Sequence, residues 1–478
     1  MNRRSLIGET STARTMAGYL LMLAVTVGLY FLVREQGEGL VAPVPVARSG
    51  PGAGASHDHT LAQVLLAIAV VTVTARLVGR AAGKYLRQPA VMGEIAAGIM
   101  LGPSLLGWLA PDAYAFLLPQ AAAPYLGIVA KIGVVLFMFL VGLELDTREL
   151  RRSPHTTLAI SHASILAPFL LGATLALALY PVYGQRGVSF TVFSLFIGVS
   201  MSVTAFPVLA RILTDRRIQT SPLGTIAIAC AAVDDATAWC LLAFVSGVAS
   251  AALGSAAITI GLVAAYLLFM YVAVRPLARW LAAREERQDR GAPVSHTVLA
   301  IVFGVLLLSA AATETIGIHA LFGAFLFGAM LPREGRLAVQ IRVRLEDTVV
   351  VLLLPVFFAF TGMRTQIGLV SSAADWLLCG AIILVATLGK FGGSFAAARL
   401  NGLGWRESSA IGVLMNTRGL MELIVLNVGL DMGVLSPTLF AMLVLMALVT
   451  TFATTPALDL LARGHRLADA LRPSPRAS

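Results

Sequence analysis

Long apolar runs separated by short polar stretches make up most of the chain. Most of these runs reach the roughly 20 residues that a helix needs to cross about 30 Å of hydrocarbon. The pattern predicts an all-α polytopic membrane protein, because a membrane β-barrel would show alternating strands of about ten residues. We expect fourteen apolar helices, near residues 16–33, 61–79, 89–106, 125–145, 156–180, 188–213, 222–246, 252–274, 295–312, 317–332, 348–363, 374–399, 407–430 and 435–462.

The positions of Lys and Arg test this count, because basic residues gather in cytoplasmic loops. We treat the first segment as an accessory N-terminal helix and number the other thirteen as core helices. Basic residues then follow every odd-numbered core helix, whereas the loops after even-numbered helices hold only Arg186 and Arg364, with Lys131 at a helix edge. A missed or extra span would break this alternation. We therefore expect an integral protein of a bacterial inner membrane with a cytoplasmic C-terminus.

The composition agrees with a membrane protein. Of the 478 residues, 58% are hydrophobic and only 13% are charged, whereas soluble domains carry about 25% charged residues. Soluble enzymes, nucleic-acid binders and disordered scaffolds are therefore excluded, and the net charge of +10 reflects the basic loops. The three cysteines lie in apolar runs without the spacing of metal ligands. We expect neither a cofactor nor a nucleic-acid partner.

The chain is expected to divide into three parts. Residues 1–60 hold an N-terminal tail, the accessory helix and an outer linker, residues 61–462 form the transmembrane domain, and residues 463–478 form a short cytoplasmic tail. The apolar segment 16–33 has two interpretations, a retained anchor or a signal peptide that is removed. Its long lead and its 18-residue apolar run favour the anchor.

Two adjacent carboxylates, Asp234 and Asp235, lie midway along the apolar segment 222–246. Charged groups inside a membrane are costly and usually mark an ion or proton pathway. Neighbouring residues on a helix point about 100° apart, so one carboxylate can bind a substrate ion while the other meets a different helix. Burial favours the neutral form of a carboxyl group and so allows proton exchange. The alternative is a pair that only forms hydrogen bonds between helices.

A single lysine, Lys390, lies inside the segment 374–399. The chain strongly favours Arg over Lys, yet the cation in this apolar run is Lys. Lys can release its proton when it is desolvated, whereas Arg effectively cannot. Two interpretations stay open: a proton carrier that faces a carboxylate, or a fixed counter-charge that neutralises one of the aspartates.

Polar residues interrupt two of the expected helices. In segment 188–213, three hydroxyl residues precede Pro207, which is expected to break the hydrogen-bond ladder. In segment 407–430, the polar run 416–419 has the same effect. The two segments are seven apart in the core count, and polar breaks at matching places in two halves are typical of inverted-repeat transporters. Ordinary kinks are the alternative.

Several polar residues of the breaks are interpreted as structural. Arg418 and Glu422 are four apart and are expected to pair on one helix face. Other acidic residues of apolar segments, such as Glu94, are alternative partners of Arg418. We place Asn416 and Pro207 in the same structural group.

Six passages give the chain its resemblance to a known family. They are the Asp234-Asp235 pair and the stretches 88–95 with 101–104, 136–144, 202–211, 317–325 and 416–424. From about residue 60 to 462, the chain resembles the monovalent cation:proton antiporter-2 family of the sodium/proton exchanger fold. It is most similar to the Kef-type and plant cation/proton exchanger branch.

The resemblance implies a fold with inverted repeats, a dimer domain and a mobile ion-carrying domain, assembled as a homodimer in the lipid bilayer. It also implies exchange of Na⁺ or K⁺ for H⁺ by alternating access, and no enzyme activity. By motif match, Asp235 binds cation and proton in turn, and Asp234 occupies the preceding, variable position. Lys390 matches the core-domain lysine of the family, and Thr204 matches the threonine at the helix crossing.

These features lead to one expected mechanism. Asp235, Asp234 and Lys390 carry the exchange, and Asp235 is the site at which the cation and the proton compete. Asp234, Thr204, Ser202 and backbone carbonyls at the breaks supply further oxygen ligands, which hard cations prefer. Asp234 pairs with Lys390 when the cation site is empty. The alternative is an uncoupled cation channel or efflux pathway, whose flux would not depend on a proton gradient.

Overall fold

The computed structural model consists of helices and connecting segments, with no β-strand among the residues it describes. These residues are 3–40, 60–86, 88–144, 155–215, 218, 221–250, 256–287, 294–316, 319–333 and 335–462. The chain forms two compact units. Unit 1 contains Met1–Val46, Arg148–Ala238 and Val370–Ser478, and unit 2 contains Ala47–Thr147 and Trp239–Leu369.

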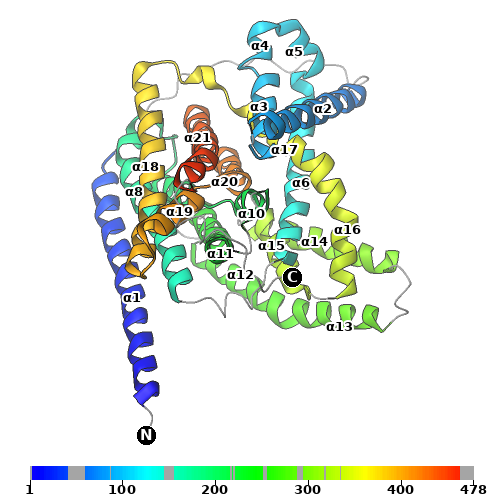
Figure 1. Ribbon diagram of the computed structural model, residues 1–478. Helices are drawn as coiled ribbons and strands as arrows, with labels where there is room; N and C mark the ends of the chain where they lie inside the picture. Colours follow the sequence, from blue (N-terminus) through cyan, green and yellow to red (C-terminus); the bar gives the residue numbers. More distant parts are fainter. Residues whose placement is uncertain are drawn as a thin grey trace. The chain divides into compact units, whose positions relative to one another are not determined.

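Unit 1 is a bundle in which α18 packs against α8, α19 and α21, as Figure 1 shows. Its helices are α1 (Arg3–Gly37), α8 (His155–Tyr183), α9 (Phe190–Ser202), α10 (Phe206–Asp215), the first part of α11 (Pro222–Ser250), α18 (Ala373–Leu400), α19 (Trp405–Met415), α20 (Leu420–Asp431) and α21 (Pro437–Ala462). Two glycines of α18 bring its backbone onto α8: a Cβ at Gly389 would lie 2.7 Å from Pro168 Cα, and one at Gly393 would lie 2.5 Å from Ala163 O. This close packing fixes the position of Lys390 against α8.

Unit 2 is built around α6, which packs on α15 and α17, and around α3, which packs on α2 and α17. Its other described elements are α4, α5, α12, α13, α14, α16 and the short segments η2 to η5. The bounds are α2 (Thr60–Leu86), α3 (Ala90–Leu101), α4 (Leu106–Leu109), α5 (Pro111–Leu117), η2 (Gln120–Ala122), α6 (Ala123–Glu144), α12 (Ala256–Phe269), η3 (Met270–Val274), α13 (Arg275–Glu286), α14 (His296–Ile316), α15 (Ala320–Met330), α16 (Arg336–Thr348), η4 (Val349–Leu353), α17 (Leu354–Arg364) and η5 (Ile367–Leu369).

An arginine completes the backbone hydrogen bonding of one irregular helix in unit 2. The helix continues from α16 to α17 through the π-helical turn η4, and Pro355 just beyond it has no N–H to donate to the carbonyl four residues earlier. Arg76 of α2 donates instead to Val350 O (2.7 Å) and Val351 O (3.2 Å). Its Nη1 atom lies 3.7 Å from Glu94 Oε1.

The prediction of an all-helical membrane protein is confirmed. Each of the fourteen expected segments contains a helix, and segments 188–213 and 407–430 are each divided into two helices. Among the described residues, nine helices are long and apolar enough to cross a membrane, and two further apolar helices, α9 and α15, are shorter. The chain is an integral membrane protein.

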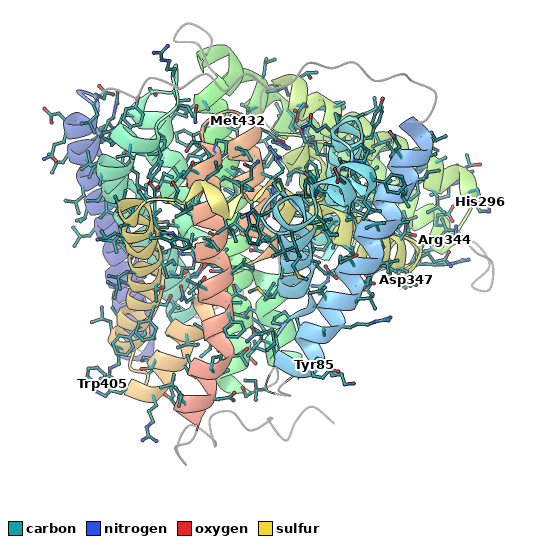
Figure 2. All side chains as sticks on the ribbon, turned by 90° about the horizontal axis from the view of Figure 1, so that it is seen from above. Tyr85, His296, Arg344, Asp347, Trp405 and Met432 are labelled. Carbon is teal, nitrogen blue, oxygen red and sulfur yellow. The ribbon has the colours of Figure 1, made fainter. Side chains whose placement is uncertain are left out.

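Two basic stretches that the sequence placed in loops are helical, so that part of the prediction was wrong. They form α13 and α16, whose Arg residues alternate with apolar positions. Each helix buries one side, with Ala278 and Ala282 buried on α13 and Leu337 and Ile341 on α16. An apolar stripe at helical spacing stabilises such a helix despite its charge. In Figure 2, Arg344 and Asp347 of α16 lie toward the same edge as His296.

Some expectations lie outside the described residues. They concern residues 41–59 of the outer linker, several of the basic loop residues and the tail 463–478. The side of the membrane that the C-terminus faces therefore stays a prediction. The accessory segment 16–33 lies within α1, which packs against α8 and α9.

Candidate functional site

The first helix break lies in the turn before Pro207, where a proline is expected to interrupt the hydrogen-bond ladder. Helix α9 ends at Ser202, residues 203–205 have no helical hydrogen bonding, and α10 begins at Phe206. Pro207 stands in the first turn of α10, where a missing N–H costs nothing because the first N–H groups of a helix have no partner inside it. Pro207 therefore starts the second helix, and the expected break lies at residues 203–205, which include the residue four positions before this proline.

The second break separates α19 from α20 at residues 416–419. Gly419 has a φ of +156°, and a Cβ at this position would lie 2.9 Å from Val208 Cγ2 of α10. Only glycine allows both the backbone conformation and the close approach. In Figure 2, Trp405 at the start of α19 and Met432 after α20 lie at opposite edges, so this broken helix crosses unit 1.

The two breaks exchange hydrogen bonds. In a continuous helix, Ala205 N–H would donate to Met201 O. Here Ala205 N–H donates to Thr417 O (3.0 Å), and Met201 O accepts from Arg418 Nη2 (2.7 Å). Two adjacent residues of the second break thus replace the hydrogen bond that the first helix loses.

Two cations occupy the C-terminal end of α9. Arg418 donates to Ser200 O (3.1 Å) and Met201 O, and Lys390 Nζ donates to Ser202 O. The last carbonyls of a helix carry partial negative charge and have no partner inside it. The sequence predicts that carbonyls at the breaks bind a transported cation. In this structure, side-chain cations of the protein itself bind these three carbonyls.

Arg418 pairs with Glu422, at 3.1 Å between Nη1 and Oε2, and both side chains are fully buried. The expected partner is correct but the expected position is not, because Arg418 lies in the break rather than on the face of α20. Thr451 of α21 holds it there: its Oγ1 accepts from Arg418 N (3.0 Å) and donates to Arg418 O (2.6 Å). Glu94 instead lies near Arg76 in unit 2.

Asp234 is fully buried and accepts hydrogen bonds from four side chains. Ser161 Oγ donates to Oδ1 at 2.5 Å. Three donors meet at Oδ2: Ser164 Oγ (2.5 Å), Thr204 Oγ1 (2.7 Å) and Lys390 Nζ (3.1 Å). The structure therefore brings together three residues that the sequence singled out, and adds two serines of α8 that it did not. Their spacing of three within an apolar segment was the available signal.

Asp235 has a different environment, although it is also buried, with 5% of its surface exposed. Among the described residues, no group stands in hydrogen-bond geometry with either carboxylate oxygen. The two adjacent carboxylates thus diverge as the helix period predicts: hydrogen-bond donors lie at both oxygens of Asp234, and at neither oxygen of Asp235 among the described residues.

The remaining candidates also lie in unit 1. Ser202 Oγ is within hydrogen-bond distance of Gly198 O (2.7 Å) and Ile165 O (3.0 Å). Its hydroxyl is therefore directed at backbone carbonyls rather than at a carboxylate. Asn416 is buried in the second break, and its Oδ1 has no hydrogen-bond partner among the described residues.

Comparison with known proteins identifies the family. The sequence profile described as sodium/hydrogen exchanger, transmembrane, matches residues 63–462. The chain belongs to this family. A Na⁺/H⁺ antiporter, NhaS4 of Synechocystis sp., is 41% identical over 82% of the exchanger-family chain and 95% of its own length. The resemblance drawn from the motifs is confirmed.

Other relatives of the exchanger-family chain are longer. K⁺/H⁺ antiporter 1 of Saccharomyces cerevisiae is 37% identical over 78% of the chain and 43% of its own length. Cation/H⁺ antiporter 20 of Arabidopsis thaliana is 41% identical over 78% of the chain and 45% of its own length. The chain therefore spans less than half of these yeast and plant relatives.

A solved structure has the same fold. The sodium proton antiporter MjNhaP1 of Methanocaldococcus jannaschii matches with a TM-score of 0.58 and 16% identity, over 87% of this chain and 99% of its own. The fold expected for the exchanger-family chain is therefore confirmed by a structure whose sequence has diverged widely.

Proposed function

We propose that this exchanger-family protein exchanges Na⁺ or K⁺ for H⁺ across the membrane by alternating access, with Asp235 binding the cation and the proton in competition. Relatives named as Na⁺/H⁺, K⁺/H⁺ and cation/H⁺ antiporters support the coarse activity. The observation that carries the site assignment is the contrast between Asp234, which accepts four hydrogen bonds, and its buried neighbour Asp235, whose oxygens are open.

Competition at one carboxylate follows from the cost of buried charge. An unpaired carboxylate in a low-dielectric interior is strongly unfavourable unless it is neutralised. A bound alkali cation or a proton neutralises Asp235, and binding of either removes the charge that attracts the other. Each crossing of the membrane then carries one of the two ligands, which couples their fluxes.

Oxygen atoms for a cation are present at the breaks. Ser200 Oγ, Asn416 Oδ1 and Thr417 Oγ1 are buried without a hydrogen-bond partner among the described residues. Hard cations prefer such oxygen ligands. Thr204 Oγ1 donates its proton to Asp234 and keeps its lone pairs for a cation, whereas the Ser202 carbonyl already accepts from Lys390 Nζ in this structure.

Lys390 sets the stoichiometry in this proposal. If it leaves Asp234 and releases its proton on cation binding, a second proton exchanges for each cation and transport is electrogenic. If it stays charged, it acts as the fixed counter-charge of Asp234 and transport is electroneutral. We further propose a homodimer in a bacterial inner membrane. The basic loops support a cytoplasmic C-terminus.

Proton flux in sealed vesicles tests the function. Purified protein is reconstituted, a pH gradient is imposed, and a pH-sensitive dye follows its collapse when Na⁺, K⁺, Li⁺ or choline is added. We expect an alkali cation, and not choline, to collapse the gradient. The Asp235→Asn variant, shown to be folded, loses this response. Persistent exchange by the variant would overturn the site assignment, and cation flux without proton movement would establish an uncoupled pathway instead.

A further inference from the structure

Two serines on one face of α8 are directed at Asp234. Ser161 and Ser164 are three residues apart, so their side chains lie on the same side of the helix, and both are fully buried. Ser161 Oγ donates to Asp234 Oδ1 and Ser164 Oγ donates to Asp234 Oδ2. Neither serine contacts Asp235 through a hydrogen bond, because both oxygens of that residue are open.

The two serines do not contribute equally. Ser161 is the only described donor to Oδ1, whereas Oδ2 also accepts from Thr204 and Lys390. Ser164 Oγ is in addition 2.8 Å from Ser161 O, and one hydroxyl proton cannot serve both acceptors fully. Loss of the Ser161 hydroxyl therefore leaves one carboxylate oxygen of Asp234 without a donor, while loss of the Ser164 hydroxyl leaves Oδ2 with two.

The two helices that carry Ser161, Ser164 and Lys390 are closely packed. Helix α8, which carries both serines, is in backbone contact with α18 at Gly389 and Gly393, on either side of Lys390. Asp234 is thus held between a pair of hydroxyls on α8 and an ammonium on α18. A carboxylate offers about four acceptor sites, and four donors lie at this one, three of them at Oδ2.

These contacts indicate a role for Ser161 and Ser164 in ion exchange, and this inference rests on the proposed function. We propose that they are positioning residues that hold Asp234 against α8 and Lys390, so that only Asp235 is open to the exchanged ions. Without them, Asp234 can turn toward the open site and compete with Asp235 for the proton and for the cation. The predicted result is a changed pH profile, beyond any loss of stability.

Other charged and titratable groups surround Asp234 and are unchanged in these variants. They are Asp235 and Cys230 on α11, Lys390 on α18 and, acting on Lys390, the Arg418–Glu422 pair. A change in pH dependence on removal of a hydroxyl alone therefore reports the hydrogen bond, because no charge has been added or removed.

The first test compares the pH profiles of exchange for Ser161→Ala and Ser164→Ala in vesicles. We expect the pH of half-maximal exchange to move toward alkaline values by about one unit in Ser161→Ala, and by less in Ser164→Ala. Thr174→Ala is the matched control, because this residue is exposed on the same helix and donates only to Leu170 O. Equal profiles in all three variants would overturn the proposal.

A second test does not depend on transport. Melting temperatures of the purified protein are measured for Ser161→Ala, Asp234→Ala and the double variant, because alanine at 234 removes the acceptor of Ser161 Oγ. If the serine acts through Asp234, its replacement lowers the melting temperature much less in the Asp234→Ala background. An equal loss in both backgrounds would show a packing role only and would overturn the proposal. Absence of exchange by the wild type would reject the proposed function but leave this cycle readable.

Discussion

Unit 1 and unit 2 each contain helix carbonyls that lack an intrahelical partner, and each supplies an arginine to them. In unit 2, Arg76 donates to Val350 O and Val351 O beside Pro355. In unit 1, Arg418 donates to Ser200 O and Met201 O at the end of α9. The chemistry of the contact is the same in both places, but the surroundings are not.

The difference lies in continuity and burial. In unit 2, the helix runs on through a π-helical turn, and the Arg76 side chain keeps 30% of its surface exposed, 3.7 Å from Glu94. In unit 1, extended residues separate the helices, and the Arg418–Glu422 pair at 3.1 Å is fully buried. A buried charge must be paired closely, and removal of one partner is then very costly. Unit 1 therefore holds a fully buried ion pair at its helix break. In unit 2, a partly exposed arginine side chain donates to the carbonyls of a π-helical turn.

The largest expected effect is a loss of exchange when the buried carboxylate of unit 1, Asp235, is replaced, but not when that of unit 2, Glu94, is replaced. Asp235→Asn removes the open carboxylate of unit 1, and we expect exchange in vesicles to fall to the level of empty vesicles. Glu94→Gln is the matched change in unit 2, and we expect it to retain exchange, since Glu94 lies beside Arg76 rather than at the breaks. Loss of exchange in both variants would break the comparison.

A large effect on stability is expected at Arg418. Arg418→Met leaves Glu422 buried without its partner and two carbonyls of α9 without donors, which costs about 3–5 kcal/mol. Thermal unfolding in detergent measures the loss. Glu422→Gln keeps a hydrogen-bond acceptor for Arg418 and is expected to cost less. A smaller loss for Arg418→Met than for Glu422→Gln would contradict the network described here.

Glycines before α20 and α16 allow a second comparison. Gly419 and Gly335 both have a positive φ, +156° and +149°, and alanine in either place strains the backbone by about 1–3 kcal/mol. A Cβ at Gly419 would also meet Val208 Cγ2 at 2.9 Å, whereas at Gly335 the nearest atom is the flexible end of Glu286 at 3.2 Å. Gly419→Ala should therefore lower the melting temperature more than Gly335→Ala; the reverse order would mean that the close approach does not matter.

The smallest effect is expected at Arg76. Arg76→Met loses two hydrogen bonds to carbonyls near the edge of unit 2, and we expect a cost of about 1 kcal/mol. The side chain is partly exposed, so its pairing with Glu94 adds little. The free energies of unfolding of Arg76→Met and Arg418→Met are compared under identical conditions. Equal losses of stability would contradict the expected difference between the units.

Much of the fold was predictable because membrane helices are visible as apolar runs. The breaks were predictable for the same reason, since a polar run such as 416–419 stands out against its surroundings. Their exact positions were not, because Pro207 suits the start of a helix as well as a kink. The basic helices α13 and α16 were missed because their Arg residues were interpreted as loop residues, although apolar residues recur among them at helical spacing.

Most of the candidate site was predictable from its charged residues, and Thr204 was predicted from the family motif. Asp234, Asp235 and Lys390 are conspicuous in apolar segments, and the structure brings Lys390 to Asp234. Ser161 and Ser164 were missed because a hydroxyl on an apolar helix satisfies itself on its own backbone in most settings. Their role depends on which helix packs against α8, and that information lies in long-range packing rather than in local spacing.

Because Ala205 N–H donates to Thr417 O, exchange of this one amide proton reports on contact between the two helix breaks. Hydrogen–deuterium exchange at Ala205 requires these two segments, distant in the sequence, to separate, because neither α9 nor α10 supplies the acceptor. Deuterium uptake at this single amide therefore measures how often the crossing opens. Its rate with and without alkali cation would give the frequency of that opening in each ligand state.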